Sequence, residues 1–369
     1  MNRGTVAEID LAALRHNLAI LRSIAGPRRI IAVVKDDAYG HGASVIAREL
    51  RSAGVECFAV AYSEEAADLR KSGLDGEIIV LFDRSFPEEC FSGTLTPVLH
   101  DLPTAERLSA AAVKRKARIS VHVKVDTGMG RMGLPPATAE EDLTRIAGLP
   151  GIGIAGLMSH FAGADLEDRS SAELQTARFR SICDGFSART GLTPLRHIAN
   201  SAAALTLPDS LFDAVRPGLL LYGVSPVRND FGLRPVMKVR SHVLTIRSVP
   251  RGVPVSYSGT FVTSRDSRIA VLPCGYADGY VRHFSNKAAV LIRGRRAPVV
   301  GRVCMDLTLA DVTDIPAAEE GDEAVLLGAQ GAEQIQAREL AGYASTISYE
   351  ILTGLGGRAR REYRGALAE

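Results

Sequence analysis

Residues 30–61 have the sequence IIAVVKDDAYGHGASVIARELRSAGVECFAVA, in which two short apolar runs enclose a segment with helical spacing. The runs at 30–35 and 57–61 are rich in Val, Ile and Ala, as buried strands are. The segment between them, residues 43–54, has the Ala, Leu, Glu and Arg content of a helix. A strand, a helix and a second strand in this order predict a parallel pair joined by a crossover helix.

The same alternation continues along the chain. Further helical segments are expected at 64–73, 104–116 and 172–190. The remaining strands are expected at 77–82, 96–100, 118–126, 152–160, 195–200 and 213–221. Eight strands over about 200 residues is the number found in a closed (β/α)8 TIM-like barrel. An open doubly wound sheet has the same alternation, and periodicity alone leaves it possible.

The pattern changes after about residue 230. Alternating polar and apolar runs, separated by Gly, Pro, Asp and Arg, occur at 236–248, 268–273, 288–293, 298–303 and 323–328. Such alternation predicts antiparallel strands, interrupted by one helix at 336–344. We therefore expect an α/β chain with a barrel domain at residues 1–230 and a mostly β domain at 231–369.

Composition excludes several classes of function. The 369 residues carry a formal net charge of +2, and no block of like charge stands out, so neither a nucleic acid nor a membrane surface is an expected partner. No apolar run is long enough to span a membrane, and the first ten residues lack the apolar core of a secretory signal. The five cysteines are scattered without a C-x-x-C pair, which predicts no disulfide framework, no metal site and a reducing cytoplasm.

Five reactive residues stand at the ends of expected barrel strands. They are Lys35, Lys124, His160, Ser201 and Arg216. Each of them alone is explained by a strand that exits into solvent, but barrel enzymes build their sites from these strand ends, and five together favour a site. A partly desolvated lysine is suited to Schiff-base formation. Loop amides and a hydroxyl after strands seven and eight are where barrels hold phosphate.

Nine motifs, in order along nearly the whole chain, resemble those of the alanine racemase family. They are AVVKDDAYGHG (32–42), HVKVDTGMGRMG (122–133), LMSHFAGAD (157–165), HIANSAA (197–203), VRPGLLLYG (215–223), VSYSGTF (255–261), GYADGY (275–280), VGRVCMD (300–306) and TISYEILTGLG (346–356). The resemblance implies a pyridoxal phosphate-dependent isomerase that interconverts L- and D-alanine. It also implies a role in supplying D-alanine for peptidoglycan.

The resemblance assigns the reacting groups. Lys35 would carry the cofactor as an aldimine and act as one of two bases, with Tyr257 as the other base on the opposite face. Arg131 and the backbone of Met305 would bind the substrate carboxylate. Lys124 matches a lysine that is often a carbamate, although an ordinary ion pair with Asp126 or another carboxylate is an alternative.

The resemblance also assigns the cofactor's surroundings. His160 would lie beside the pyridine ring, Arg216 would meet the ring nitrogen, and Tyr276 would line the substrate entry. The phosphate would be held by Tyr39, Ser201, Gly218, Leu219 and Tyr349. Arginine is a permanent donor, so it should leave the ring nitrogen unprotonated and weaken the cofactor as an electron sink. The family further implies a homodimer in which Tyr257 and Met305 serve the site of the partner subunit.

Some positions depart from the family pattern, and other functions stay open. Asp36 and Asp37 stand where Ala followed by Asn or Asp is common, Leu307 replaces a frequent Gln, and the tail at 356–363 lacks the usual proline. A racemase for serine or another amino acid is the nearest alternative. A decarboxylase of similar plan would pair the ring nitrogen with an acid, and a non-catalytic pyridoxal phosphate-binding barrel would lack the second domain.

Overall fold

The computed structural model describes residues 4–365, so the outer ends of both expected domains, residues 1–3 and 366–369, lie outside the described residues. The chain divides into two compact units. The barrel unit contains Arg15–Asp36 and Ser44–Leu233. The C-terminal unit contains the described residues up to Leu14, the short segment Asp37–Ala43, and the chain from Arg234 onward.

Eight parallel strands form the barrel unit in the order β8-β7-β6-β5-β4-β3-β2-β9. Asp213 N donates to Arg196 O, and Arg216 N donates to Ala199 O, so β8 and β9 are also joined. These bonds close the sheet, which confirms a (β/α)8 barrel and excludes an open doubly wound sheet. The strands are β2 (Arg29–Val33), β3 (Cys57–Val60), β4 (Glu77–Val80), β5 (Thr96–Leu99), β6 (Ile119–Lys124), β7 (Ile152–Met158), β8 (Leu195–His197) and β9 (Ala214–Val215).

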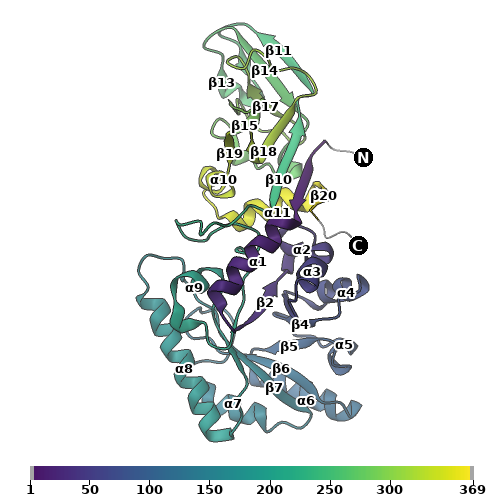
Figure 1. Ribbon diagram of the computed structural model, residues 1–369, viewed down its shortest axis with the longest axis vertical. Helices are drawn as coiled ribbons and strands as arrows, with labels where there is room; N and C mark the ends of the chain where they lie inside the picture. The colour runs from purple at the N-terminus through teal and green to yellow at the C-terminus, as the bar shows by residue number, and fades with distance from the viewer. Residues whose placement is uncertain (1–3, 366–369) are drawn as a thin grey trace. The chain divides into compact units, whose positions relative to one another are not determined.

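Helices follow the strands, and Figure 1 shows α6, α7 and α8 on the outside of the barrel strands. The helices expected at 43–54, 64–73, 104–116 and 172–190 are confirmed, and the structure contains further helices in this part of the chain. The helices from the N-terminus to the end of the barrel unit are α1 (Leu11–Ala25), α2 (Lys35–Tyr39), α3 (Ala43–Ser52), α4 (Ser63–Lys71), α5 (Glu88–Phe91), α6 (Leu102–Arg115), α7 (Ala139–Ala147), α8 (Ser170–Thr190), α9 (Ser201–Thr206) and η1 (Pro208–Ser210).

The last barrel strand is shorter than the expected segment 213–221. It ends at Val215, because the chain then enters a series of turns in which Leu221 N donates to Gly218 O and Tyr222 N donates to Leu219 O. The apolar residues after Arg216 are buried in these turns and not in a strand. The turns bring backbone N–H groups to the rim of the barrel.

The C-terminal unit is a set of small sheets. The largest has the order β16-β15-β18-β10-β1-β20, with β19 beside β18, and the others are β11-β14-β17 and β12-β13. The strands are β1 (Val6–Asp10), β10 (Met237–His242), β11 (Thr245–Val249), β12 (Pro254–Val255), β13 (Phe261–Val262), β14 (Ser267–Leu272), β15 (Ala289–Ile292), β16 (Arg295–Pro298), β17 (Thr308–Asp311), β18 (Glu323–Gln330), β19 (Glu333–Ile335) and β20 (Arg360–Arg364). The helices are η2 (Tyr257–Gly259), η3 (Tyr276–Asp278), η4 (Arg282–Phe284), α10 (Ala337–Ala344) and α11 (Ser348–Arg358).

Two features of this unit differ from the expectation. The run at 298–303 is not a strand: β16 ends at Pro298, and Gly301 has a φ of +73° where a Cβ would lie 2.6 Å from the Cβ of Ser256. The first strand of the chain, β1, belongs to the large sheet, antiparallel to β10 and parallel to β20. Figure 1 shows the purple β1 beside the green β10.

Among residues 4–365, no helix combines the length and the apolar character needed to cross a membrane. The five cysteines are all free thiols, four of them buried and Cys304 half-buried.

Candidate active site

The five reactive residues expected at strand ends all lie in the barrel unit, on the side where the strands end. Lys35 follows β2, Lys124 is the last residue of β6, and His160 follows β7. Ser201 begins the helix after β8, and Arg216 follows β9. Because the strands are parallel, their carboxyl ends share one rim, and the side chains converge there.

Arg216 is buried among neutral acceptors. Its Nη1 donates to Nδ1 and to the carbonyl oxygen of His197, both at 2.7 Å, and its Nη2 donates to Ser159 O at 2.5 Å and Ile198 O at 3.2 Å. Burial lowers the pKa of Arg216 to about 9, so it keeps its charge near neutral pH. Its Nε donates to no acceptor in the described part of the chain. The guanidinium is thus held in place, and its Nε–H remains available as a donor.

His160 is neutral at this rim. Its Nδ1 lies 3.4 Å from Nη2 of Arg216. Burial, and then the charge on Arg216, lower its pKa to about 3. A neutral imidazole at this position can accept a hydrogen bond or stack on a flat ring, and it adds no second cation beside Arg216.

Lys35 and Arg131 both lie near the ring of a residue that no sequence pattern indicated, Phe82. The Nζ of Lys35 and the guanidinium carbon of Arg131 are each 5.7 Å from the centroid of the Phe82 ring. Lys35 Nζ is also 3.3 Å from a carboxylate oxygen of Asp36, one of the departures noted above. The structure therefore brings the expected cofactor lysine and the expected carboxylate-binding arginine to one aromatic side chain.

Arg131 is carried on a loop that Asp126 organises. The Asp126 carboxylate accepts from four backbone N–H groups at 2.8 to 3.1 Å, those of residues 128–131. Burial opposes ionisation of Asp126, yet these donors hold its pKa below the usual value. The run Asp-Thr-Gly is a sequence signal for such an Asx turn. Gly133 is required here, because a Cβ would lie 2.7 Å from Asp126 N.

Lys124 is buried and has no acceptor among residues 4–365. Burial, and then the positive charges of Arg131 and Arg216, lower its pKa to about 8. The ion pair with Asp126 that the sequence left open is absent from the described residues, since Asp126 is engaged by backbone N–H groups. An uncompensated buried ammonium is costly, so this position favours a neutral amine or a modified one.

Ser201, Gly218 and Leu219 meet at the rim as expected. The buried hydroxyl of Ser201 accepts from Gly218 N at 3.0 Å and from Leu220 N at 3.4 Å. The N–H of Leu219, which is also buried, has no acceptor in the part of the chain that the structure describes. A hydroxyl beside an unsatisfied backbone N–H is a donor set that fits a phosphate oxygen.

In the C-terminal unit, Tyr39 and Tyr349 form a second pair of expected phosphate ligands. Their rings are 5.6 Å apart at an interplanar angle of 43°. Gly40 beside Tyr39 has a φ of +83°, and a Cβ there would lie 2.7 Å from Leu352 O. The two phenols, far apart in sequence, are thus fixed on one side of α11.

The segment that carries Tyr39 has an unusual backbone. Residues 36–39 all have φ between +53° and +55°, a left-handed turn that costs L-residues about 1–2 kcal/mol each. Asp37 supports the turn: its carboxylate accepts from Ala43 N at 2.7 Å and pairs with Arg361 at 2.5 Å. The segment after the cofactor lysine and the proline-free tail therefore contact each other through Asp37 and Arg361.

Tyr257, Tyr276 and Met305 lie on an exposed face of the C-terminal unit. Their exposed fractions are 67%, 42% and 54%. Ser256 Oγ donates to Arg302 O at 2.7 Å, and Ala277 N donates to Met305 O at 3.0 Å, so the three loops are hydrogen-bonded to one another. The Met305 N–H has no acceptor among the described residues.

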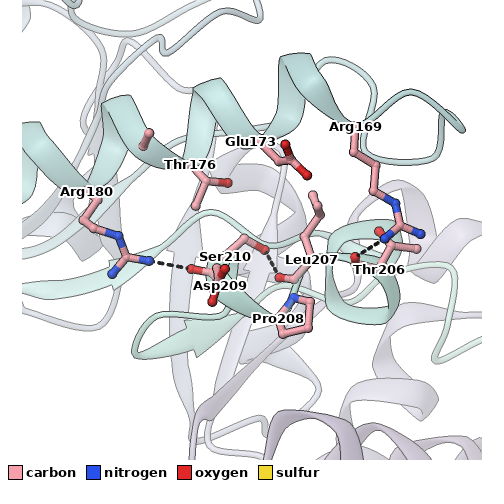
Figure 2. A pocket seen from close by; sticks show the side chains of 10 residues that line it. Arg169, Glu173, Thr176, Arg180, Thr206, Leu207, Pro208, Asp209 and Ser210 are labelled. Carbon is pink, nitrogen blue, oxygen red and sulfur yellow. Dashed lines mark hydrogen bonds between the residues drawn. The ribbon is translucent and has the colours of Figure 1, made fainter.

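A separate hollow of about 380 Å³ lies between α8 and residues 206–210 (Figure 2). Arg169 donates to Thr206 O and Arg180 to Asp209 O, both at 2.9 Å, so both guanidinium groups are engaged by backbone. None of the expected site residues lines this hollow. The expected site residues lie instead at the barrel rim and, in the C-terminal unit, at the Tyr39–Tyr349 pair and on the exposed face with Tyr257, Tyr276 and Met305.

Comparison with known proteins covers almost the whole chain. The family model of the alanine racemase N-terminal domain matches residues 9–226, and that of the C-terminal domain matches residues 236–363. An alanine racemase of Thermodesulfovibrio yellowstonii is 49% identical over 98% of each chain. The alanine racemase of a Streptomyces lavendulae that produces D-cycloserine has a TM-score of 0.93 at 37% identity, covering 98% of this chain and 97% of that one. The Bartonella henselae enzyme, solved with covalently bound pyridoxal phosphate, has a TM-score of 0.88 at 32% identity, covering 98% of this chain and 99% of that one.

Proposed function

The chain belongs to the alanine racemase family, and we propose how its own residues divide the work of this pyridoxal phosphate-dependent isomerase, which interconverts L- and D-alanine. Lys35 is proposed as the covalent anchor of the cofactor and as one base, and Tyr257 as the second base. Arg216 is proposed to meet the ring nitrogen through its free Nε. The observation that carries this proposal is the burial of Arg216 among neutral acceptors.

The barrel rim fits the cofactor. The Ser201 hydroxyl and the N–H of Leu219 are suited to donate to a phosphate, and Gly218 lets backbone approach closely. Tyr39 and Tyr349, which the family resemblance gives as further phosphate ligands, form a pair of phenols within the C-terminal unit. Neutral His160 is suited to lie beside the ring. When bound, pyridoxal phosphate makes the Cα proton of an amino acid removable by spreading the charge left behind.

Racemisation then needs a base on each face of the substrate. Lys35 takes or returns the Cα proton on one face, and the phenol oxygen of Tyr257 returns or takes it on the other. The substrate leaves with its proton on the opposite face, and the two bases exchange protonation states. Without a second base, a single lysine would have to serve both faces. A strongly exposed tyrosine beside Met305 is suited to meet a substrate presented from outside its own unit.

The substrate carboxylate is proposed to bind between Arg131 and the Met305 N–H. Arg131 is held by the Asp126 loop, and the Met305 N–H is free to donate. Lys124 is proposed to be a carbamate: its amine adds to carbon dioxide with loss of one proton. The anion that results removes an uncompensated cation from beside Arg131 and orients the guanidinium.

The enzyme is proposed to act as a homodimer with shared sites. Tyr257 and Met305 are exposed in a single chain, and reciprocal two-fold pairing allows each to reach a barrel of the partner subunit. We further propose that the enzyme works in the cytoplasm and supplies D-alanine for peptidoglycan. The free thiols agree with a reducing compartment.

The proposal is tested by incubating the purified chain and pyridoxal phosphate with L-alanine, L-serine and a panel of other amino acids. Chiral analysis should find D-alanine with a kcat/KM at least about tenfold above that for serine. Carbon dioxide release without racemisation would instead identify a decarboxylase. The Tyr257→Phe variant serves as the control, since it keeps the ring and removes the proposed base.

A further inference from the structure

Arg216 is the first member of a line of buried polar groups that runs through the barrel. His197, which accepts from Arg216 through Nδ1, has its Nε2 2.8 Å from Nδ1 of His122. Nε2 of His122 lies 4.0 Å from Oε1 of Glu77, an electrostatic contact beyond hydrogen-bonding distance. We call Arg216, His197, His122 and Glu77 the donor chain. It begins at the catalytic rim and ends at the first residue of β4, on the opposite end of the barrel.

The direction of every bond in the donor chain follows from chemistry. A guanidinium has donors and no acceptor, so Nδ1 of His197 must be unprotonated where it meets Arg216. Neutral His197 therefore has its proton on Nε2 and donates it to Nδ1 of His122. His122 in turn has its proton on Nε2, which points toward the Glu77 carboxylate.

Both histidines are held in the neutral form that this argument needs. Burial, followed for His197 by the charge on Arg216, lowers its pKa well below the usual value. Burial lowers the pKa of His122 to about 4, although Glu77 opposes the shift. Less than 2% of either side chain is exposed.

The fold makes room for this arrangement. Gly156 on β7 lies against the ring of His122, and a Cβ there would be 2.7 Å from three of its ring atoms. Glu77 keeps its place through Arg29, at 2.9 Å from Oε2, and through the Thr96 hydroxyl, at 3.3 Å from Oε1. The carboxylate thus has fixed partners on its outer side and faces His122 on its inner side.

We propose that Glu77 and His122 are positioning residues for Arg216: the Glu77 carboxylate selects the Nε2–H form of both histidines, which leaves His197 Nδ1 free to accept from the guanidinium. Without the negative charge, only the donors of Arg216, at the other end of the donor chain, still favour a proton on Nε2 of His122. If the proton moves to Nδ1, His197 must accept through Nε2 and carry its own proton on Nδ1. Two donors would then face each other over the 2.7 Å between His197 and Arg216.

The effect on catalysis rests on the function proposed for Arg216, whereas the tautomers do not depend on it. The test therefore has two readouts on the full-length protein, with and without added pyridoxal phosphate. Nitrogen-15 NMR of the histidine rings distinguishes protonated from unprotonated nitrogens. Steady-state kinetics with L-alanine separates kcat from KM.

We expect both histidines of the wild-type protein to be neutral with the proton on Nε2. In Glu77→Gln, His122 should shift toward the Nδ1–H form, and kcat should fall about tenfold with KM changed less than about twofold. Arg29→Gln is the matched control: it removes the same ion pair with Glu77 but keeps the carboxylate, so the tautomers and kcat should stay as in the wild type.

A wild-type His197 protonated on Nδ1 would overturn the proposal without any variant. So would unchanged tautomers in Glu77→Gln, or an equal change in Arg29→Gln, since the ion pair alone would then explain the effect. A tautomer shift without loss of kcat would overturn the positioning role. The Arg216→Glu measurement described below then shows separately whether Arg216 itself matters.

Discussion

The barrel rim and the face around Tyr257 hold their functional groups in opposite ways. At the rim, Arg216 is 4% exposed and fixed by several acceptors, whereas Tyr257 is 67% exposed on a short 3-10 turn. Two groups of the rim, Arg216 and His160, have a charge state that must stay constant through the proposed reaction, and burial helps to fix it for His160 by lowering its pKa to about 3. The exposed face contains the proposed second base. In the proposed homodimer, a single chain would provide these two halves to two different sites.

The largest expected effect tests whether the two halves belong to different chains. Lys35→Ala and Tyr257→Phe should each lower activity by about 10²–10⁴-fold, because each removes one base. Random pairing of equal amounts makes half of the dimers mixed, each with one intact site, so about a quarter of wild-type activity should return after co-refolding. No recovery in mixed dimers verified by mass spectrometry would mean that one chain supplies both bases.

The next effect concerns the fixed charge of the rim. Arg216→Glu should slow racemisation by about 10²-fold and raise the share of turnovers that end in pyruvate and pyridoxamine phosphate. A carboxyl group at this position would keep the ring nitrogen protonated, which would strengthen the electron sink. Quantifying both products against D-alanine gives the partition. Unchanged partition would place the ring nitrogen's partner elsewhere, and Arg216→Lys, which keeps the positive charge, is the control.

A smaller effect is expected from the carbamate at Lys124. Its pKa of about 8 leaves part of the amine neutral near pH 7.5, and carbamate formation should increase as pH rises through about 8. Carbon-13 NMR with labelled bicarbonate should show one carbamate signal that disappears in Lys124→Gln. That variant should lose about tenfold in kcat/KM. The signal must persist in Lys35→Ala, since otherwise the modified amine is a different one.

The smallest effect tests how the rim loop holds Arg131. Asp126→Asn should destabilise the protein by about 1 kcal/mol and raise KM, because weaker acceptors meet the four backbone N–H groups. The folded-state pKa of Asp126 lies below its unfolded value, so its stabilisation is present above the unfolded pKa and lost as pH falls through the folded one. Urea unfolding between pH 7 and pH 3 should show less acid dependence in the variant.

The sequence predicted the barrel well, because its strands are apolar runs bounded by helical segments. It did not predict β1, since Val6–Asp10 pairs with strands more than 200 positions away, and local pattern contains no such information. Helix α11 was missed because Gly354, Gly356 and Gly357 lower its helix propensity, and packing overrides that cost.

The site was predicted from residue types at strand ends and from the family resemblance. Phe82, which lies near both Lys35 and Arg131, follows an apolar strand and has no chemical signature of its own. Glu77 lies at the N-terminal end of β4, whereas barrel active sites are expected at the C-terminal ends of the strands. Residues such as Glu77, which act on the site through other residues, can be recognised only from the distances in the structure.

The left-handed turn at residues 36–39 restricts how this chain can change by mutation. β-branched residues are excluded from all four positions, because their Cβ substituents clash most in that conformation. Asp and Asn tolerate it, and Gly adopts it freely. The acidic pair Asp36–Asp37 is therefore compatible with this backbone, which Ala38 and Tyr39 also adopt. Genetic drift beside the cofactor lysine should accordingly exchange charge and hydrogen-bonding capacity much more readily than side-chain shape.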